Sequence, residues 1–499
     1  MMPLLFDLRS VVVLVGLLHG AGAAVVAGCN EGTLQKATQI SLGFAHSCAI
    51  LDDGTLRCWG YNQAFGTLGL GDSSDRGDGN DMGRFLPPVS LGTGRTATAT
   101  SVGDFYTCAI LDNGTVKCWG YNDGGELGLG DTNHRGDGAN EMGDNLPAVD
   151  LGAGRTAAAL SLGSLHACVI LDDATVKCWG GNANGQLGYG DTLERGSNST
   201  VMGANLATVD LGSGKTATAV SCGNKFSCAL LNDATIKCWG ANTYGNLGLG
   251  DTDHRGDAAN EMGDNLLAVS LGAGRTAISV SAHLDHACAV LDDGSLKCWG
   301  SNVGGKLGVG DAANRGAASG EMGDTLPVVA LGANRTAVAV SVGQHCTCAR
   351  LDDASLKCWG SNLNGVLGLS STTKFGDGTN AMSTLPAVDF GSGRTVAHVS
   401  SGSLHNCVIL DDGTVKCWGD NLQGRLGLGD TVTRGDVAND MGDNLPVTKL
   451  GYCTCVPGFT NPVEAACSKC GAGTYKTGSG SALCTSCPEN ADSGVGSTG

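Results

Sequence analysis

An all-β fold is predicted by three features of this chain of 499 residues. The tripeptide Cys-Trp-Gly occurs seven times, with successive spacings of 60, 60, 60, 60, 60 and 59 residues. Each unit holds four short apolar runs, separated by turns rich in glycine and aspartate, and no unit shows a helical apolar period. Units of this kind match the four-stranded blades of a propeller, so the sequence predicts a closed seven-bladed β-propeller.

The chain divides around these repeats. Arg9, the apolar stretch 11–18 and small residues up to Ala27 have the layout of a secretory signal peptide, with an uncleaved signal anchor as the alternative. No second membrane span is expected in the mature chain. The expected divisions are a signal peptide at 1–27, an N-terminal segment at 28–37, repeats at 38–97, 98–157, 158–217, 218–277, 278–337, 338–396 and 397–451, and a small disulfide-rich module at 452–499.

Each Cys-Trp-Gly follows another cysteine by ten residues, with a hairpin between the two. Counting outward from Asp53 places Cys48 opposite Cys58 on adjacent strands, within disulfide range. A zinc site is the rival, but the signal peptide implies an oxidising compartment. The predicted disulfides are Cys48–Cys58, Cys108–Cys118, Cys168–Cys178, Cys228–Cys238, Cys288–Cys298, Cys348–Cys358 and Cys407–Cys417.

The other cysteines leave several possibilities open. The C-terminal module carries Cys453, Cys455, Cys467, Cys470, Cys484 and Cys487, whose spacing suits disulfides or a zinc ribbon and does not fix the pairing. Cys29, Cys222 and Cys346 are left over, as free thiols or with partners outside the chain. Cys29 also ends a stretch that resembles a bacterial lipoprotein acylation box.

The formal net charge of −18 argues against nucleic-acid binding, because an acidic surface repels phosphate. The sequence contains no nucleophile elbow, phosphate loop or zinc-hydrolase helix motif, so we expect no enzyme and no cofactor. Seven tryptophans, one at the same place in each unit, predict blade core rather than a chromophore cluster.

The repeat Gly-x-x-His-x-Cys-Ala-x-Leu-Asp-Asp-Gly-Thr-Val-Lys-Cys-Trp-Gly, clearest at 43–72, 163–191 and 402–430, resembles that of the regulator of chromosome condensation family. The resemblance implies a seven-bladed propeller and, in the founding member, a guanine-nucleotide exchange factor for a small GTPase. The C-terminal cysteines resemble ephrin-receptor and tumour-necrosis-factor-receptor modules. The two together resemble the ectodomain plan of crinkly-type receptor kinases.

One aligned position alternates between histidine and other residues. It holds His46, Tyr106, His166, Phe226, His286, Cys346 and His405. Phe and Tyr are incompatible with a ring of catalytic or metal-binding groups. We therefore expect a packing role for half-buried rings, with the imidazoles bonded to neighbouring backbone.

Four units contain Arg-Gly-Asp, which in a secreted protein invites an integrin interpretation. Six units, however, share Asp-x3-Arg, and the sixth unit loses both members together, as Ser371 and Phe375. Joint loss favours a structural ion pair within the loop. The expected pairs are Asp72–Arg76, Asp131–Arg135, Asp191–Arg195, Asp251–Arg255, Asp311–Arg315 and Asp430–Arg434.

Two further kinds of site are weighed. Loop acids such as Asp131, Asp137, Glu141 and Asp144 could bind calcium, but Arg135 competes for them and the spacing matches no known loop. In a eukaryotic host, Asn113, Asn198 and Asn334 are glycosylation acceptors.

The sequence thus predicts a secreted or cell-surface, non-catalytic binding module for a protein or glycan. A partner is expected at loop positions that vary between units, 73–75, 133–134 and 193–194. The alternatives are the extracellular part of a longer receptor, of the kinase type, and an exchange factor.

Overall fold

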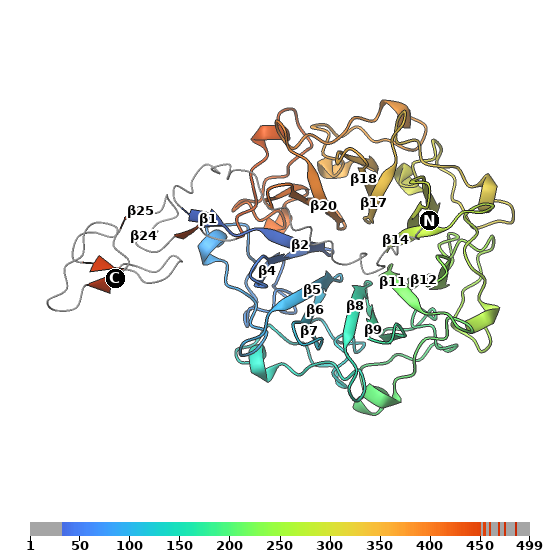
Figure 1. The fold of residues 1–499 in the computed structure, drawn as a ribbon, viewed down its shortest axis with the longest axis horizontal. Coiled ribbons are helices and arrows are strands. Elements are labelled where there is room, and N and C mark those ends of the chain that lie inside the picture. The colour runs from blue at the N-terminus through green and yellow to red at the C-terminus, as the bar shows by residue number, and fades with distance from the viewer. Residues whose placement is uncertain are drawn as a thin grey trace, which may run out of the picture.

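Seven three-stranded antiparallel sheets surround a central axis in this computed structural model, which describes residues 32–450 and five short strands after them (Figure 1). The strands, in chain order and three to a sheet, are β2 (Ala37–Leu42), β3 (His46–Leu51), β4 (Leu56–Gly60); β5 (Ala97–Val102), β6 (Tyr106–Leu111), β7 (Val116–Gly120); β8 (Ala157–Leu162), β9 (His166–Leu171), β10 (Val176–Gly180); β11 (Ala217–Cys222), β12 (Phe226–Leu231), β13 (Ile236–Gly240); β14 (Ala277–His283), β15 (His286–Leu291), β16 (Leu296–Gly300); β17 (Ala337–Val342), β18 (Cys346–Leu351), β19 (Leu356–Gly360); and β20 (Val396–Ser401), β21 (His405–Leu410), β22 (Val415–Gly419).

Short elements complete the described chain. The loops contain 3₁₀ turns at η1 (Gly83–Phe85), η2 (Gly143–Asn145), η3 (Ser199–Val201), η4 (Gly203–Asn205), η5 (Gly263–Asn265), η6 (Val303–Gly305), η7 (Gly323–Thr325), η8 (Leu363–Gly365), η9 (Met382–Thr384), η10 (Leu422–Gly424) and η11 (Gly442–Asn444). Outside the ring, β1 (Gly32–Leu34) pairs with β23 (Cys453–Cys455), β24 (Phe459–Thr460) with β25 (Ser468–Lys469), and β26 (Thr474–Tyr475) with β27 (Thr485–Ser486). The predicted signal peptide lies outside the described residues, as do the side chains of the C-terminal module.

The all-β prediction is confirmed, but the prediction of four strands per blade is wrong. Each sheet has three strands, and its outer edge carries only one bridge to the following loop, such as Gly60 to Arg76. In that loop a side-chain hydrogen bond takes the place of the backbone hydrogen bonds of a fourth strand: Asn62 Nδ2 donates to the backbone oxygen of Asp72 (2.7 Å). A segment rich in glycine and aspartate gains more from such side-chain bonds than from an extended conformation.

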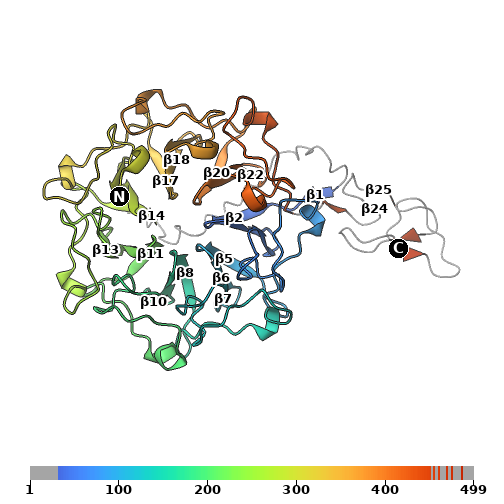
Figure 2. The same cartoon turned by 180° about the vertical axis from the view of Figure 1, so that it is seen from behind.

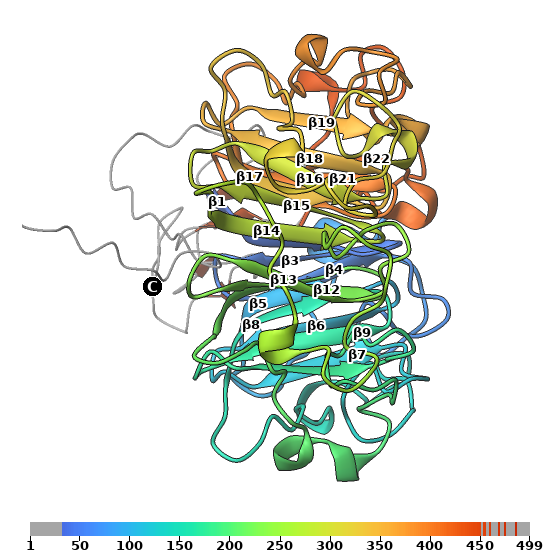
Figure 3. The same ribbon diagram turned by 90° about the vertical axis from the view of Figure 1, so that its right-hand side faces the viewer.

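The ring closes by the same contact that joins every other pair of blades. The amide of Ala97 in blade 2 donates to Gly54 O of blade 1, and that of Ala37 in blade 1 donates to Gly413 O of blade 7, both at 2.9 Å. Each sheet uses consecutive strands of one repeat, and the innermost strands β2, β5, β8, β11, β14, β17 and β20 face the axis (Figure 2). A side view shows the sheets stacked around this axis (Figure 3).

The blade core is built from the cysteine pairs and the tryptophans. All seven predicted disulfides are present in the register expected, with Cys48 opposite Cys58 and Cα–Cα distances of 4.0 or 4.1 Å. The seven tryptophans are at most 1% exposed, and each Nε1 donates to a carbonyl of the preceding blade at 2.9–3.1 Å. The prediction that tryptophan forms the blade core is therefore confirmed.

The lysine in the recurring Lys-Cys-Trp-Gly has a structural role that was not predicted from the sequence. Lys117 is buried, and its Nζ donates to Leu91 O (3.0 Å) and Gly143 O (2.7 Å). Burial lowers the pKa of Lys117. The same pair of carbonyl bonds recurs at Lys177, Lys237, Lys297 and Lys416. Over the ranges described above, no helix has the length and apolar character needed to span a membrane.

Candidate functional site

The position that holds His46 lies at the boundary between adjacent blades. His46 is fully buried, and its Nε2 lies 2.8 Å from Thr107 Oγ1 of the next blade. The Thr107 hydroxyl donates its proton to Thr67 O (3.0 Å). It can therefore only accept from His46, whose Nε2 is the donor. Burial lowers the pKa of His46 to about 3, so the ring is neutral at physiological pH. A packing role is found, but the expectation of half-buried rings with imidazoles bonded to backbone is wrong, because the rings are buried and the imidazoles bond to hydroxyls.

The alternation at this position follows the residue it meets in the next blade. Histidine always faces a hydroxyl, as in His166–Ser227 (2.8 Å), His286–Thr347 (2.9 Å) and His405–Ser47 (2.9 Å). Tyr106 and Phe226 instead precede blades with Ala167 and Ala287 at the hydroxyl position. The Ser–His contacts thus resemble catalytic pairs only in composition, because each is buried and each hydroxyl already donates to a carbonyl.

Two of the unpaired cysteines are buried thiols. Cys222 and Cys346 are free in the described residues, and burial raises the pKa of Cys222 to about 12 and that of Cys346 to about 11. Cys222 lies with His166 and Cys168 in a group whose ligand atoms fall within 4.8 Å, but Cys168 is bonded to Cys178. Cys29 lies outside the described residues.

The Asp-x3-Arg residues lie together in all six loops. The Arg Nη2 to Asp Oδ2 distances are 2.5–2.7 Å, and Arg135 also donates to Asn133 O (2.9 Å). In the sixth unit Phe375 replaces the arginine and joins the hydrophobic core. The arginines of the four Arg-Gly-Asp tripeptides thus fold back onto their own loops, and a structural role for these pairs stays our prediction.

The loop acids considered as calcium ligands accept hydrogen bonds from protein groups. Glu141 accepts from the amides of Gly136 and Gly138, both at 2.9 Å, and Asp144 accepts from Thr93 of blade 1. These contacts do not test calcium binding. The glycosylation acceptors Asn113, Asn198 and Asn334 are exposed.

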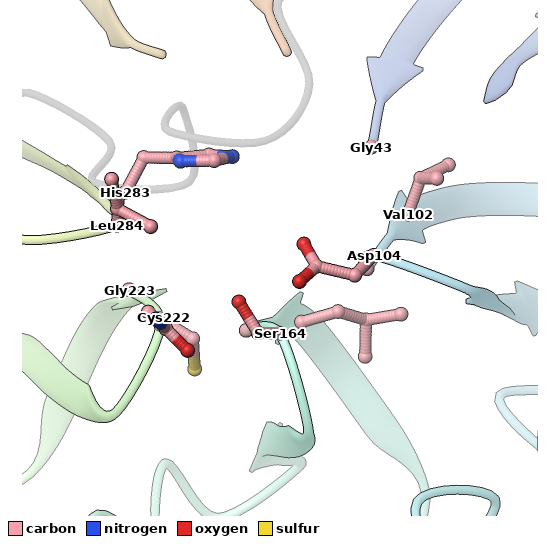
Figure 4. A pocket seen from close by; sticks show the side chains of 12 residues that line it. Gly43, Val102, Asp104, Ser164, Cys222, Gly223, His283 and Leu284 are labelled. Atoms are coloured by element: carbon pink, nitrogen blue, oxygen red, sulfur yellow. The ribbon is translucent and has the colours of Figure 1, made fainter. Parts of the chain in front are cut away.

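Turns between the first and second strands of each blade meet at the axis, and their residues differ from unit to unit. A Cβ on Gly43 would lie 2.1 Å from Gly103 O, so the backbones of adjacent turns approach too closely for a side chain there. Asp104, Ser164 and His283 project toward the axis (Figure 4). The cavity they line measures about 10 Å³, room for about one water molecule.

A larger hollow of about 370 Å³ lies between units 1 and 2. Its lining includes Gly69, Gly71, Pro87 and Met142, residue types that recur in most units, together with Pro88, which is specific to unit 1. Residues that recur throughout a repeat array serve the scaffold, so this hollow is a weaker candidate than a surface built from unit-specific residues.

Such a surface lies where the loops of blades 1 and 2 meet, and we call it the aromatic surface: Phe44, Tyr61, Phe65, Phe105, Tyr121 and His134. The rings form one connected cluster. Phe105 contacts Phe44, Tyr61 and Phe65 with centroid distances of 5.5–6.1 Å, and Phe65 lies 5.0 Å from both Tyr121 and His134. Tyr121 stacks on His134 at 5.4 Å. All six side chains retain solvent exposure, with Phe44 at 37%.

Comparison between units shows that the scaffold does not require these rings. The position of Tyr61 and Tyr121 holds Gly181, Ala241, Ser301, Ser361 and Asp420 in the other units. The position of Phe105 holds Ala45, Leu165, Lys225, Asp285, His345 and Leu404. Five blades fold without Phe, Tyr or Trp at either place, so packing alone does not explain the cluster.

Carboxylates surround the aromatic surface. Asp123 is 66% exposed and lies 3.7 Å from His134 Nε2, while Asp104 precedes Phe105 in the same turn. Burial first, and then the charges of Asp123 and Glu126, raise the pKa of Tyr121 to about 12. The loop cations Arg76 and Arg135 are held by Asp72 and Asp131. The rings therefore lie in a negative environment.

His134 is the one residue of the aromatic surface among the variable loop positions predicted to contact a partner. The others were missed because they lie far apart in sequence and meet only when adjacent loops pack. The available signal was that aromatic residues follow Cys-Trp-Gly in units 1 and 2 alone.

Comparison with known proteins identifies the repeats. Six segments, 37–66, 97–126, 157–186, 217–246, 277–305 and 396–425, match the regulator of chromosome condensation (RCC1) repeat. Six of the seven units therefore carry an RCC1-type repeat, on a fold of seven three-stranded sheets. The sixth unit is not among the matched segments, yet it forms the same sheet with the same disulfide.

The chain is similar to known proteins, one by sequence and two by structure. The ultraviolet-B receptor UVR8 of Arabidopsis thaliana is 28% identical over 406 residues, 80% of each chain. The structure of yeast RCC1 (Prp20) bound to Kap60 matches with a TM-score of 0.59 at 16% identity, over 84% of this chain and 89% of that one. The CRINKLY WD40 ectodomain of the Arabidopsis thaliana receptor kinase ACR4 gives 0.41 at 16%, over 80% and 98%.

Proposed function

We propose that this protein is an extracellular, non-catalytic binding module that contacts a partner through the aromatic surface. One observation carries the proposal: partly exposed rings gather on blades 1 and 2 at positions where the other blades need none. Exposed aromatic clusters are typical of recognition sites, because large rigid rings gain contact area at little entropic cost.

The extracellular location is supported by the disulfides. Seven buried bridges, one in each blade, are a pattern of oxidising compartments. The same surface would serve a secreted module or the ligand-binding part of a longer receptor. The likeness to yeast RCC1, at 16% identity, concerns the fold alone, so exchange activity is not transferred to this chain.

Absence of catalysis is part of the proposal. The buried histidines serve the blade boundaries, where their hydroxyl partners already donate to backbone. A net charge of −18 supports partners other than nucleic acid.

The test is an unbiased selection of random peptides displayed on phage against the oxidised full chain. A parallel selection uses the variant Tyr61→Ser, Phe105→Leu, Tyr121→Ala, whose new residues occur at the same positions in other units. We expect binders that lose at least tenfold in affinity for this variant. The matched control is Tyr244→Ala, which removes an exposed ring from blade 4 and should leave binding intact. Binders insensitive to the triple variant would contradict the proposal.

A further inference from the structure

We propose that the aromatic surface binds a basic peptide segment, with lysine or arginine side chains placed against its rings. This inference rests on the proposed function, and it names the chemical class of the partner. It combines the geometry of the ring cluster with the charge around it.

The rings attract cations. The face of an aromatic ring carries partial negative charge, so a Lys or Arg group within about 6 Å of its centre is attracted to it. Phe44, Tyr61 and Tyr121 lie at the periphery of the cluster, since each contacts only one or two of the other rings. A partner therefore meets several rings within one short segment.

The charges of the surrounding loops favour the same partner. Asp123 is 66% exposed beside Tyr121 and His134, and Asp75 of blade 1 accepts from the amide of Asn62, the residue after Tyr61, at 2.7 Å. Arg76 and Arg135 are engaged by their own aspartates at 2.6 and 2.7 Å. A cationic segment would meet rings and carboxylates together, whereas an acidic segment would be repelled.

The aliphatic part of lysine and arginine adds to the fit. Their methylene chains lie well on aromatic rings while the charged group reaches a carboxylate. The arrangement also accounts for the combination of features in unit 2, where Phe105, Tyr121 and Asp123 replace Leu165, Gly181 and Ala183 of unit 3. Unit 3 thus has neither an aromatic nor an acidic residue at these three positions.

The experiment measures fluorescence polarisation of a labelled peptide, Gly-Ser-Lys-Leu-Lys-Gly-Lys-Leu-Lys-Ser-Gly, on the oxidised full chain. We expect saturable binding that weakens at least tenfold when the four lysines are acetylated, and several-fold between 50 and 200 mM NaCl. Asp123→Ala, which copies unit 3, should weaken binding, and so should His134→Asn.

His254→Asn is the matched control for His134→Asn. His134 Nδ1 and His254 Nδ1 accept the same loop amide at 3.1 Å, and asparagine makes that bond in unit 5, where Asn314 accepts from Asn302 (2.9 Å). Both variants keep the loop bond, but only His134 belongs to the ring cluster. If the peptide bound only through nonspecific attraction to the net charge of −18, it would bind every ring variant as well as the unchanged protein.

The outcomes separate this inference from the proposed function. Equal binding of the acetylated peptide, or binding insensitive to Tyr61→Ser with Tyr121→Ala, overturns the inference. Binding of the neutral sugar chitohexaose at the aromatic surface, with no binding of the basic peptide, also overturns it. In the unbiased selection, surface-dependent binders that lack lysine and arginine would leave the proposed function standing and reject this inference alone.

Discussion

His46 of blade 1 and Thr107 of blade 2 form a buried hydrogen bond, 2.8 Å between Nε2 and Oγ1, that crosses a blade boundary. The same hydroxyl donates to Thr67 O, which also accepts from Trp119 Nε1. One carbonyl of blade 1 thus receives two donors from blade 2. This network recurs where histidine meets serine or threonine, and alanine takes the hydroxyl position where tyrosine or phenylalanine replaces histidine.

The coupling of these two residues gives the first prediction. Thr107→Ala should destabilise the protein by about 1–3 kcal/mol, because it leaves the buried Nε2–H of His46 without an acceptor. Adding His46→Phe reproduces the Phe226–Ala287 pair of blades 4 and 5 and should recover part of that loss. Urea unfolding of the two single variants and the double variant measures the interaction. Strictly additive losses would count against the bond.

Acid sensitivity follows from the same histidines. Burial lowers the pKa of His46 and of His166 to about 3, below the ordinary value of 6.5. The unfolded chain therefore binds more protons below pH 6.5, and stability should fall as the pH drops from about 6.5 toward 3. Melting temperatures across this range measure the effect, and His46→Phe with Thr107→Ala should reduce the slope. If this double variant left the dependence of melting temperature on pH unchanged, groups other than His46 would cause the acid sensitivity.

Glu126 should have the opposite effect on the pH dependence of stability. It is 2% exposed, and burial raises its pKa to about 7 from 4.5. Ionisation is disfavoured in the folded state, so this residue's contribution to stability is lost as the pH rises from about 4.5 to 7. Glu126→Gln, the residue of unit 3 at Gln186, should raise the melting temperature at pH 8 and change it little at pH 4. Equal shifts at both pH values would rule out a titration effect.

The cysteines give a chemical prediction. Non-reducing peptide mapping should find seven bridges within the blades, each closing a separation of ten residues. Cys222 and Cys346 are buried with raised pKa values, so iodoacetamide should label them slowly in the folded protein and quickly after unfolding. Rapid labelling in the native state, or blades with free thiols, would contradict both the pairing and the extracellular location.

Local sequence was sufficient for the ring and its disulfides. A spacing of ten residues across a three-residue turn fixes Cys48 opposite Cys58, since both lie within one hairpin. Local sequence did not reveal that the fourth strand is absent, because at that place the side chain of Asn62 bonds to the backbone of the loop. It also missed the aromatic surface, because Phe44 and Phe105 come from different units and meet only when two turns pack at the axis.

The central claim, that blades 1 and 2 carry the binding site, is tested most directly by carbene footprinting of the full chain with and without a selected peptide. We predict protection of Tyr61, Phe65, Phe105 and Tyr121 by the peptide, and no change at Tyr244 of blade 4. Protection confined to other blades, with these four rings labelled equally in both states, would contradict the account.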